Sequence, residues 1–236
     1  MYRLICLVVG YAFGLIQSAY IMGRMKGVDI RTVGSGNAGS TNALRAFGTK
    51  AGFTVLFCDA LKTIVAILLM RFTIGLAKPD AVALITLYTA IGVILGHNFP
   101  FYLNFKGGKG MAATLGLILA LLSLQPMYFL TMFPLFVVIF LTTHYVSLGS
   151  MLAYVLFFGE TIVFGLIGML GDNLSTAKLI ELDCIAFFLM ALAIFQHRKN
   201  VVRLIKGEES KTYLSKKNKE KYKAMMAEKE AAKKEA

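Results

Sequence analysis

The chain has 236 residues, 57% of them hydrophobic and 16% charged, and its mean hydropathy is +0.68. Soluble domains are less apolar and carry more charge, so this composition excludes that class and indicates an integral membrane protein. The formal net charge is +12. The distribution of the basic residues therefore indicates how the chain is oriented in a membrane.

Seven apolar segments are close to the length of about 20 residues that crosses a hydrocarbon layer. The first segment has the position of a signal peptide, but it lacks a small-x-small cleavage site and six further segments follow, so we expect a retained helix. The sequence predicts an all-α bundle of seven transmembrane helices. In chain order they cover residues 4–22, 53–75, 80–96, 109–124, 126–144, 148–170 and 178–195.

Basic residues gather between the first and second segments, between the third and fourth, and after the last. The positive-inside rule places these regions in the cytoplasm, and an odd number of spans then puts the N-terminus outside and the C-terminus inside. We expect four cytoplasmic segments to share one face. They are residues 23–52, 97–108, 144–148 and 196–209.

The first of these segments contains VGSGNAGSTNALR, residues 33–45, in which glycines alternate with hydroxyl and amide side chains. Glycine permits backbone angles at which successive N–H groups converge on an anion. A flexible Gly/Ser linker is the alternative, but linkers seldom hold two asparagines and an arginine so close together. The pattern favours an anion site.

The second segment is GHNFPFYLNFKGGKGMAA, residues 96–113. It does not fit the Walker P-loop, because Gly110 follows Lys109 where Ser or Thr is required. Three glycines at the expected N-terminus of a helix, with Lys106 and Lys109 beside them, nevertheless suit a phosphate group. Lysines that extend to lipid headgroups are the alternative, which leaves the glycines unexplained. His97 is either a capped interfacial residue or a proton carrier.

The third and fourth segments give weaker signals when each is taken alone. In THYVSLGSM, Ser147 and Ser150 flank a turn and suit either helix capping or a donor role. In QHRKNVVRLIKGEE, His197 and Asn200 fall on one stripe with Arg203 if the last helix continues beyond the membrane. A cationic helix on the membrane surface is the alternative for the fourth segment.

Two ionisable residues, Asp59 and Lys62, lie three positions apart inside the second apolar segment, on one helical face. Such residues inside a membrane either neutralise each other or serve a functional site, and both interpretations stay open. Cys6, Cys58 and Cys184 show no paired spacing and are expected to be buried, inert thiols. Residues 210–236 are rich in Lys, Glu and Ala and are expected to form a solvated tail that contacts anionic lipid headgroups.

Three motifs together resemble the signatures of the bacterial membrane glycerol-3-phosphate acyltransferase family that uses acyl phosphate as donor. The THYVSLGSM turn and the Asp59–Lys62 pair are also similar to that family. The chain departs from it at Ala38, where proline is common, and at Thr63, where glycine is common. The motifs are SGNAGSTNALR (35–45), GHNFPFYLNFKGGKGMAA (96–113) and HRKNVVRLIKGEE (197–209).

The resemblance implies a multi-pass enzyme of the bacterial inner membrane, with its site facing the cytoplasm. A transmembrane acyltransferase domain would cover 1–209, and a charged cytoplasmic tail 210–236. The enzyme would transfer a fatty acyl group from acyl phosphate to the sn-1 hydroxyl of glycerol 3-phosphate, giving lysophosphatidic acid and inorganic phosphate. No cofactor, metal ion or nucleic acid is implied. The expected partners are the two substrates, membrane lipids and the enzyme that produces acyl phosphate.

Roles for individual residues follow from the resemblance as hypotheses. The catalytic candidates are His97, His197, Ser35 and Lys109, and the attacking hydroxyl's proton passes to either histidine or to a substrate phosphate oxygen. A membrane transporter of an organic phosphate is the alternative function, although transporters bind near the membrane midplane and commonly show internal repeats. The substrate-binding candidates are Ser35, Asn37, Asn42, Arg45, Lys106, Gly107, Gly108, Lys109, Gly110, Ser147, His197 and Asn200.

Overall fold

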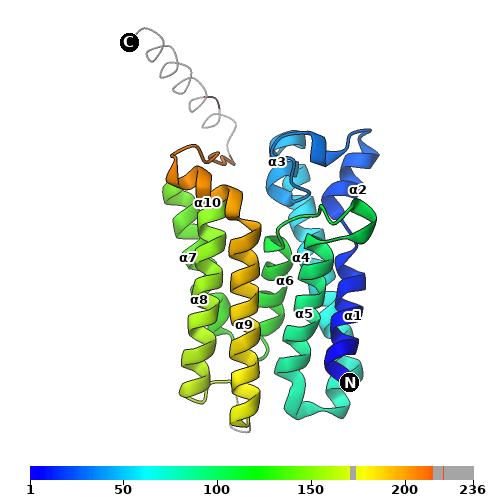
Figure 1. Ribbon diagram of the computed structural model, residues 1–236, viewed down its shortest axis with the longest axis vertical. Helices are drawn as coiled ribbons and strands as arrows, with labels where there is room; N and C mark the ends of the chain where they lie inside the picture. Colours follow the sequence, from blue (N-terminus) through cyan, green and yellow to red (C-terminus); the bar gives the residue numbers. More distant parts are fainter. Residues whose placement is uncertain (171–173, 215–219, 221–236) are drawn as a thin grey trace.

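The computed structural model describes residues 1–170, 174–214 and residue 220, and every regular element in this part of the chain is helical. The longer helices run beside one another, while the short helices α2, α3 and α10 gather at the end opposite the N-terminus (Figure 1). The helices are α1 (Tyr2–Gly14), α2 (Ser18–Met25), α3 (Ser40–Phe47), α4 (Thr49–Met70), α5 (Val82–Asn98), α6 (Met111–Leu121), α7 (Met127–Thr143), α8 (Val146–Leu166), α9 (Thr176–Gln196) and α10 (Arg198–Ile205).

Five helical stretches of the described chain are long and apolar enough to cross a membrane. They are Tyr2–Met25, Thr49–Gly75, Pro79–Leu103, Val146–Leu166 and Thr176–Gln196. Two shorter apolar helices, α6 and α7, fall in the remaining predicted segments. The all-helical class is confirmed, while seven crossings and the sidedness of the chain stay predictions.

Helices α1 and α5 touch through their backbones. Both carry glycines four residues apart: Gly10 and Gly14 in α1, and Gly92 and Gly96 in α5. A Cβ atom on any of the four would overlap a backbone carbonyl of the other helix. Small residues at this spacing let two helix backbones approach closely. The contact therefore fixes the height of α5, and of His97 at its end, relative to α1.

The first predicted segment, residues 4–22, is not one uninterrupted helix. It breaks between α1 and α2 at Gln17, which is fully buried. The Gln17 side-chain amide donates to the backbone carbonyls of Gly14 (3.1 Å), Gly96 (3.3 Å) and His97 (3.0 Å). These bonds satisfy carbonyls that the ends of α1 and α5 leave open. Through these bonds Gln17 links the end of α1 to the end of α5, next to His97.

The chain also turns after α9, at His197, and α10 crosses over the ends of the bundle (Figure 1). The break comes at the start of the expected stripe, so His197, Asn200 and Arg203 still lie along one helix and line the same cavity. Residues 208–214, called the strap here, then fold back over the bundle: the Thr212 N–H donates to the carbonyl of His144 (2.9 Å). Residues 210–214 of the expected tail thus contact the bundle, and the rest of the tail, apart from residue 220, lies outside the described part.

The three cysteines are unpaired, as expected, but only Cys6 is buried. Cys58 and Cys184 are exposed on the outer faces of α4 and α9. The expectation of burial fails for these two because apolar helix faces that meet lipid carry the same residue types as the core.

Candidate functional site

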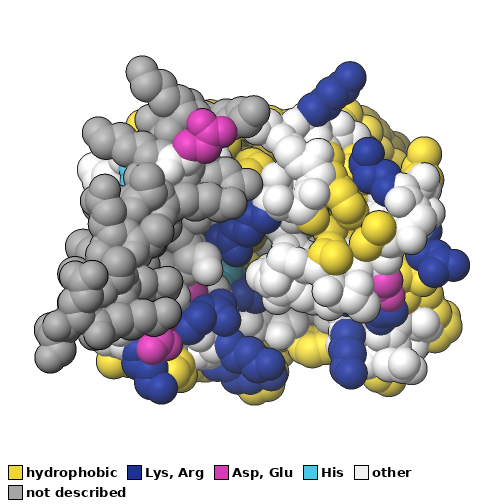
Figure 2. All heavy atoms as spheres, turned by 90° about the horizontal axis from the view of Figure 1, so that it is seen from above, with side chains coloured by type: hydrophobic (Ala, Val, Ile, Leu, Met, Phe, Trp, Pro, Cys, Tyr) yellow, Lys and Arg dark blue, Asp and Glu magenta, His cyan; other side chains and the backbone are white. Residues whose placement is uncertain are grey.

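A polar cavity of about 380 Å³ lies at the end of the bundle where α2, α3 and α10 gather. Lys and Arg side chains spread over this face (Figure 2). The four segments that the sequence singled out all contribute to the lining. They are the loop before α3 with the start of α3, residues 105–112, the start of α8, and the turn from α9 into α10.

The wall before α3 is held together by Asn42, which is 1% exposed. Its side-chain oxygen accepts from the Ser35 N–H (2.8 Å), and its amide nitrogen donates to the carbonyls of Ile30 (2.9 Å) and Val33 (3.0 Å). Both amide hydrogens are used in these bonds. These contacts give Asn42 a role in shaping the loop. Asn42, Ser35 and Asn37 all line the cavity, and the contact of each with substrate stays a prediction.

Another wall is the glycine loop, residues 104–110, which leads into α6. The N–H of Gly107 donates to the carbonyl of Asn98 (3.2 Å) and the N–H of Gly108 to that of His97 (3.0 Å). These two donors fold the loop onto α5 and are not directed at a ligand. Gly110, with φ +80°, starts α6 in the left-handed region. The first-turn N–H groups of α6 have no partner inside the helix, so they are the donors suited to an anion.

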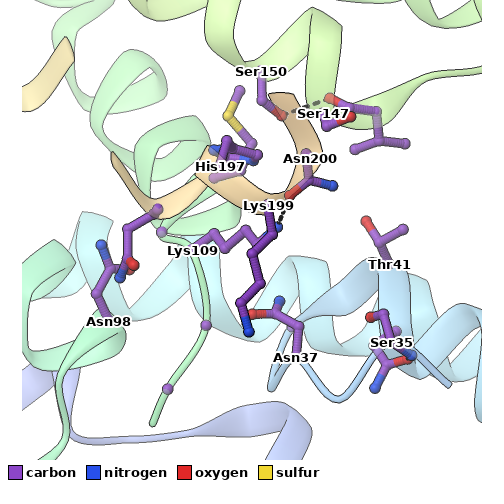
Figure 3. A pocket seen from close by; sticks show the side chains of 18 of the residues that line it. Ser35, Asn37, Thr41, Asn98, Lys109, Ser147, Ser150, His197, Lys199 and Asn200 are labelled. Carbon is purple, nitrogen blue, oxygen red and sulfur yellow. Dashed lines mark hydrogen bonds between the residues drawn. The ribbon is translucent and has the colours of Figure 1, made fainter. Parts of the chain in front are cut away.

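Lys109 extends from the glycine loop into the cavity, where its ammonium donates to the Asn200 side-chain oxygen of α10 (Figure 3). The Asn200 amide in turn donates to Glu209 (2.6 Å). Glu209, 7% exposed, also accepts from Ser147 (2.8 Å) and from Arg203 (2.7 Å). One carboxylate thus connects α8, α10 and the strap. Ser147 donates its proton to this carboxylate and not into the cavity.

Replacing Glu209 with alanine is expected to destabilise the protein by about 2 kcal/mol, because Asn200 and Ser147 lose a charged acceptor while they stay buried. Glu208→Ala is the matched control, since the neighbouring carboxylate is exposed. The midpoint of thermal unfolding in detergent should fall for the first variant and stay near wild type for the second. Equal midpoints would show that Glu209 does not hold these elements together.

The cavity environment shifts the pKa values of Lys109 and His197. Burial, followed by the charge of Arg203, lowers the pKa of Lys109 to about 8. Burial and the charge of Lys109 lower the pKa of His197 to about 4, so its ring is neutral at physiological pH. The His197 Nδ1 lies 2.8 Å from the carbonyl oxygen of Ala193. A carbonyl only accepts, so Nδ1 carries the proton and Nε2 keeps a free lone pair.

Arg45 of α3 faces the strap across the mouth of the cavity. Its guanidinium donates to the Ser210 carbonyl (3.1 Å) and to the Thr212 hydroxyl (2.9 Å). Burial lowers the pKa of Arg45, although an arginine stays protonated under these conditions. The strap therefore completes the rim of the site, and its residues from 210 onward were expected to be tail.

The cavity lining also contains Asp59 and Asn98, which the sequence did not assign to the site, next to the catalytic candidate His97. These residues line the cavity from α4 and α5, and all three are buried. Within the described chain, neither polar atom of the Asn98 side chain has a hydrogen-bond partner. Such a buried amide is suited to a bound ligand or water. The position of Asn98 inside the second motif could have indicated a role in the site. Glu209 could have been found in the same way, because it lies inside the third motif.

The structure brings every sequence-predicted site residue to the lining of this one cavity. Lys106 is exposed at the mouth, whereas Lys109 reaches inside. Their individual roles in catalysis or binding stay predictions. The thirteen residues are Ser35, Asn37, Asn42, Arg45, His97, Lys106, Gly107, Gly108, Lys109, Gly110, Ser147, His197 and Asn200.

Comparison with known proteins gives one consistent result. Residues 4–207 match the family model described as glycerol-3-phosphate acyltransferase. The chain belongs to this family. A glycerol-3-phosphate acyltransferase of Clostridioides difficile (strain 630) is 40% identical over 210 residues, which cover 88% of this chain and 94% of the relative. One of Thermoanaerobacter sp. (strain X514) is 36% identical, over 89% and 96% of the two chains.

Solved structures agree with the family assignment. The acyltransferase is similar to the crystal structure of PlsY (YgiH), an integral membrane glycerol 3-phosphate acyltransferase, in its glycerol 3-phosphate form. The TM-score is 0.73 and the identity 32%, over 90% of this chain and 96% of that one. For the lysophosphatidic acid form the TM-score is 0.71 and the identity 30%, over 91% and 97%. The acyltransferase is thus a multi-pass membrane enzyme.

Proposed function

We propose that the enzyme transfers a fatty acyl group from acyl phosphate to the sn-1 hydroxyl of glycerol 3-phosphate, releasing lysophosphatidic acid and inorganic phosphate. The polar cavity would face the cytoplasm at the bacterial inner membrane, where the basic segments are expected. Both substrates carry phosphate, and one carries a long apolar chain. The site must therefore offer cationic and backbone donors next to an apolar channel.

One observation carries this proposal: the polar cavity adjoins an apolar groove of about 410 Å³. Both share the lining residues Ser40, Thr41, Met111, Ala112 and Val146. The groove continues between α4, α6 and α7 toward the middle of the bundle, along Leu115 and Ile118 of α6 and Met132 of α7, and the strap borders it with Leu214. An acyl chain lying there would keep its phosphate end in the polar cavity.

The proposed chemistry needs no strong nucleophile, because acyl phosphate is an activated mixed anhydride. A bond forms between the sn-1 oxygen and the carbonyl carbon, and the bond from that carbon to the phosphate oxygen breaks. Phosphate leaves as an anion that Lys109 and the first turn of α6 are suited to stabilise. The free lone pair on His197 Nε2 makes it the preferred acceptor for the hydroxyl proton, with a substrate phosphate oxygen as the other candidate.

The pH dependence of kcat/KM is expected to follow Lys109, because this parameter reports the groups of the free enzyme. Below its pKa of about 8 the ammonium attracts phosphate, and above it the group is neutral. The value of kcat/KM for glycerol 3-phosphate should therefore fall as the pH rises through about 8. In Lys109→Arg, whose side chain stays charged, this alkaline fall should disappear whatever the residual rate. An unchanged fall would assign it to another group.

The apolar groove is expected to determine which acyl chain lengths the enzyme accepts. Leu115→Trp should narrow the groove one turn of α6 below the polar cavity and lower kcat/KM for palmitoyl phosphate about tenfold relative to a short acyl phosphate. Leu122→Trp adds the same bulk beyond the end of α6 and outside the groove, so it should leave the ratio unchanged. Equal ratios for the two variants would remove the groove as the acyl site.

The reaction itself is tested with the purified full-length protein and radiolabelled glycerol 3-phosphate. Acyl phosphate, acyl-CoA and acyl carrier protein are offered as separate donors. Labelled lysophosphatidic acid formed with acyl phosphate alone supports the proposal. Product formed only with a thioester donor would overturn the donor assignment, and uptake of label into vesicles without product would favour the transporter.

A further inference from the structure

A buried polar cluster lies directly beneath the glycine loop. Asp59 and Lys62 come from α4 and His97 from the end of α5, and the three are 0%, 5% and 2% exposed. The Lys62 ammonium lies 2.8 Å from Asp59 Oδ1 and 3.0 Å from His97 Nδ1. The ion pair accounts for the presence of both charges inside an apolar helix, but it does not account for the contact with the histidine.

The hydrogen bonds of Lys62 determine which histidine nitrogen carries a proton. An ammonium group has three hydrogens, and three short contacts take them: Ile16 O at 2.6 Å, Asp59 Oδ1 at 2.8 Å and His97 Nδ1 at 3.0 Å. Gly14 O is more distant, at 3.4 Å. Because Lys62 donates to it, Nδ1 must accept. A proton on Nδ1 would point at a cation, and the nearest carboxylate oxygen, on Asp59, is 3.8 Å away.

The other ring nitrogen faces the glycine loop. A Cβ atom on Gly108 would overlap His97 Nε2, so the loop backbone lies directly against this edge of the imidazole. The Gly108 N–H is bonded to the His97 carbonyl, and both residues line the polar cavity. Nε2 is therefore the ring nitrogen on the side of the glycine loop, whose lysines, with the first turn of α6, favour an anion.

We propose that Lys62 is a positioning residue that holds His97 as the Nε2–H tautomer, and that His97 thereby donates a hydrogen bond to a substrate phosphate. This inference rests on the proposed function for the identity of the anion. It divides the work of the two site histidines: His97 is a donor, and His197, with its bare Nε2, is the proton acceptor. Lys62 itself touches no substrate.

The tautomer is measured directly by nitrogen NMR of the full-length protein containing isotope-labelled histidine. The variant His144→Gln/His197→Gln leaves His97 as the single histidine and identifies its signals in the wild type. At neutral pH and without substrate, His97 should show an unprotonated Nδ1 and a protonated Nε2. A protonated Nδ1 in the wild type would overturn the proposal, whether or not the enzyme acylates glycerol 3-phosphate.

Removing the lysine tests the consequence. In Lys62→Met, Asp59 becomes the neighbour that attracts a proton to Nδ1, so the tautomer should invert and kcat should fall about 100-fold, as for loss of one preorganised donor. Lys50→Met removes an exposed lysine from the same helix and should change neither readout. An unaltered His97 signal in Lys62→Met would contradict the assignment.

A double variant separates positioning from charge balance. Lys62→Met alone leaves a buried carboxylate without its cation and can impair folding. Asp59→Asn/Lys62→Met removes both charges, so a purely structural pair would recover folding together with activity. The proposal expects the folded double variant to stay about 100-fold slow, because nothing then fixes the Nε2–H form. Recovery of more than half of the wild-type rate would refute it.

Discussion

Replacement of Lys109 with alanine is expected to lower kcat/KM for glycerol 3-phosphate on the order of 1,000-fold. Its ammonium is the cation that the glycine loop carries into the cavity, and it is held there by Asn200. Burial and the neighbouring positive charges lower its pKa to about 8. A bound phosphate anion would therefore stabilise the charged ammonium as well as being stabilised by it. The loss should appear in both kcat and KM.

The control for Lys109→Ala is Lys206→Ala, which removes an exposed lysine at the end of α10, outside the cavity lining. Both variants should insert into membranes and give the same thermal midpoint as wild type. Near-normal turnover of Lys109→Ala would remove this residue from the mechanism. Equal losses in the two variants would instead attribute the effect to the overall charge of this face.

A second large effect is expected from Gly108→Ala, also on the order of 1,000-fold in kcat/KM. The added Cβ would overlap the His97 ring and lie 2.9 Å from the Ala38 carbonyl oxygen. Neither neighbour is the end of a flexible side chain, so the loop itself must move. The hydrogen bond from the residue-108 N–H to the His97 carbonyl is then lost, and the first turn of α6 moves with the loop.

Gly159→Ala is the matched control for Gly108→Ala, because a Cβ on that helical glycine meets open space. Folding is checked by yield and thermal midpoint, and activity by the acylation assay. A Gly108→Ala enzyme that keeps more than half of its activity would show that the loop tolerates this displacement. The site would then not depend on the close approach of Gly108 to His97.

The sequence was sufficient to predict the helical class and to choose the segments that surround the cavity. Apolar runs report helices that lie in lipid, and clusters of glycine, amide and basic residues stand out against them. It could not give the hydrogen bonds that those residues form. Asn42 and Ser147 are expected to contact substrate, and the structure adds that Asn42 holds the loop before α3 and that Ser147 donates to Glu209.

Other differences arise from contacts between distant parts of the chain. Glu209 lies inside the third motif but received no role from the sequence, because its partners are contributed by α8 and α10, which meet only in the folded protein. The link from Lys62 to His97 spans two helices in the same way. Gln17 breaks an apolar segment that hydropathy alone reads as continuous, since its amide bonds to carbonyls of α5.

The backbone contact between α1 and α5 has a consequence for how sequence change is tolerated. Four glycines that are not among the cavity-lining residues set the depth at which the imidazole of His97 lies. A methyl group at any of them would push α1 and α5 apart and displace His97 from its place in the cavity lining. Positions that never meet a reactant should thus be as intolerant of variation as those that do.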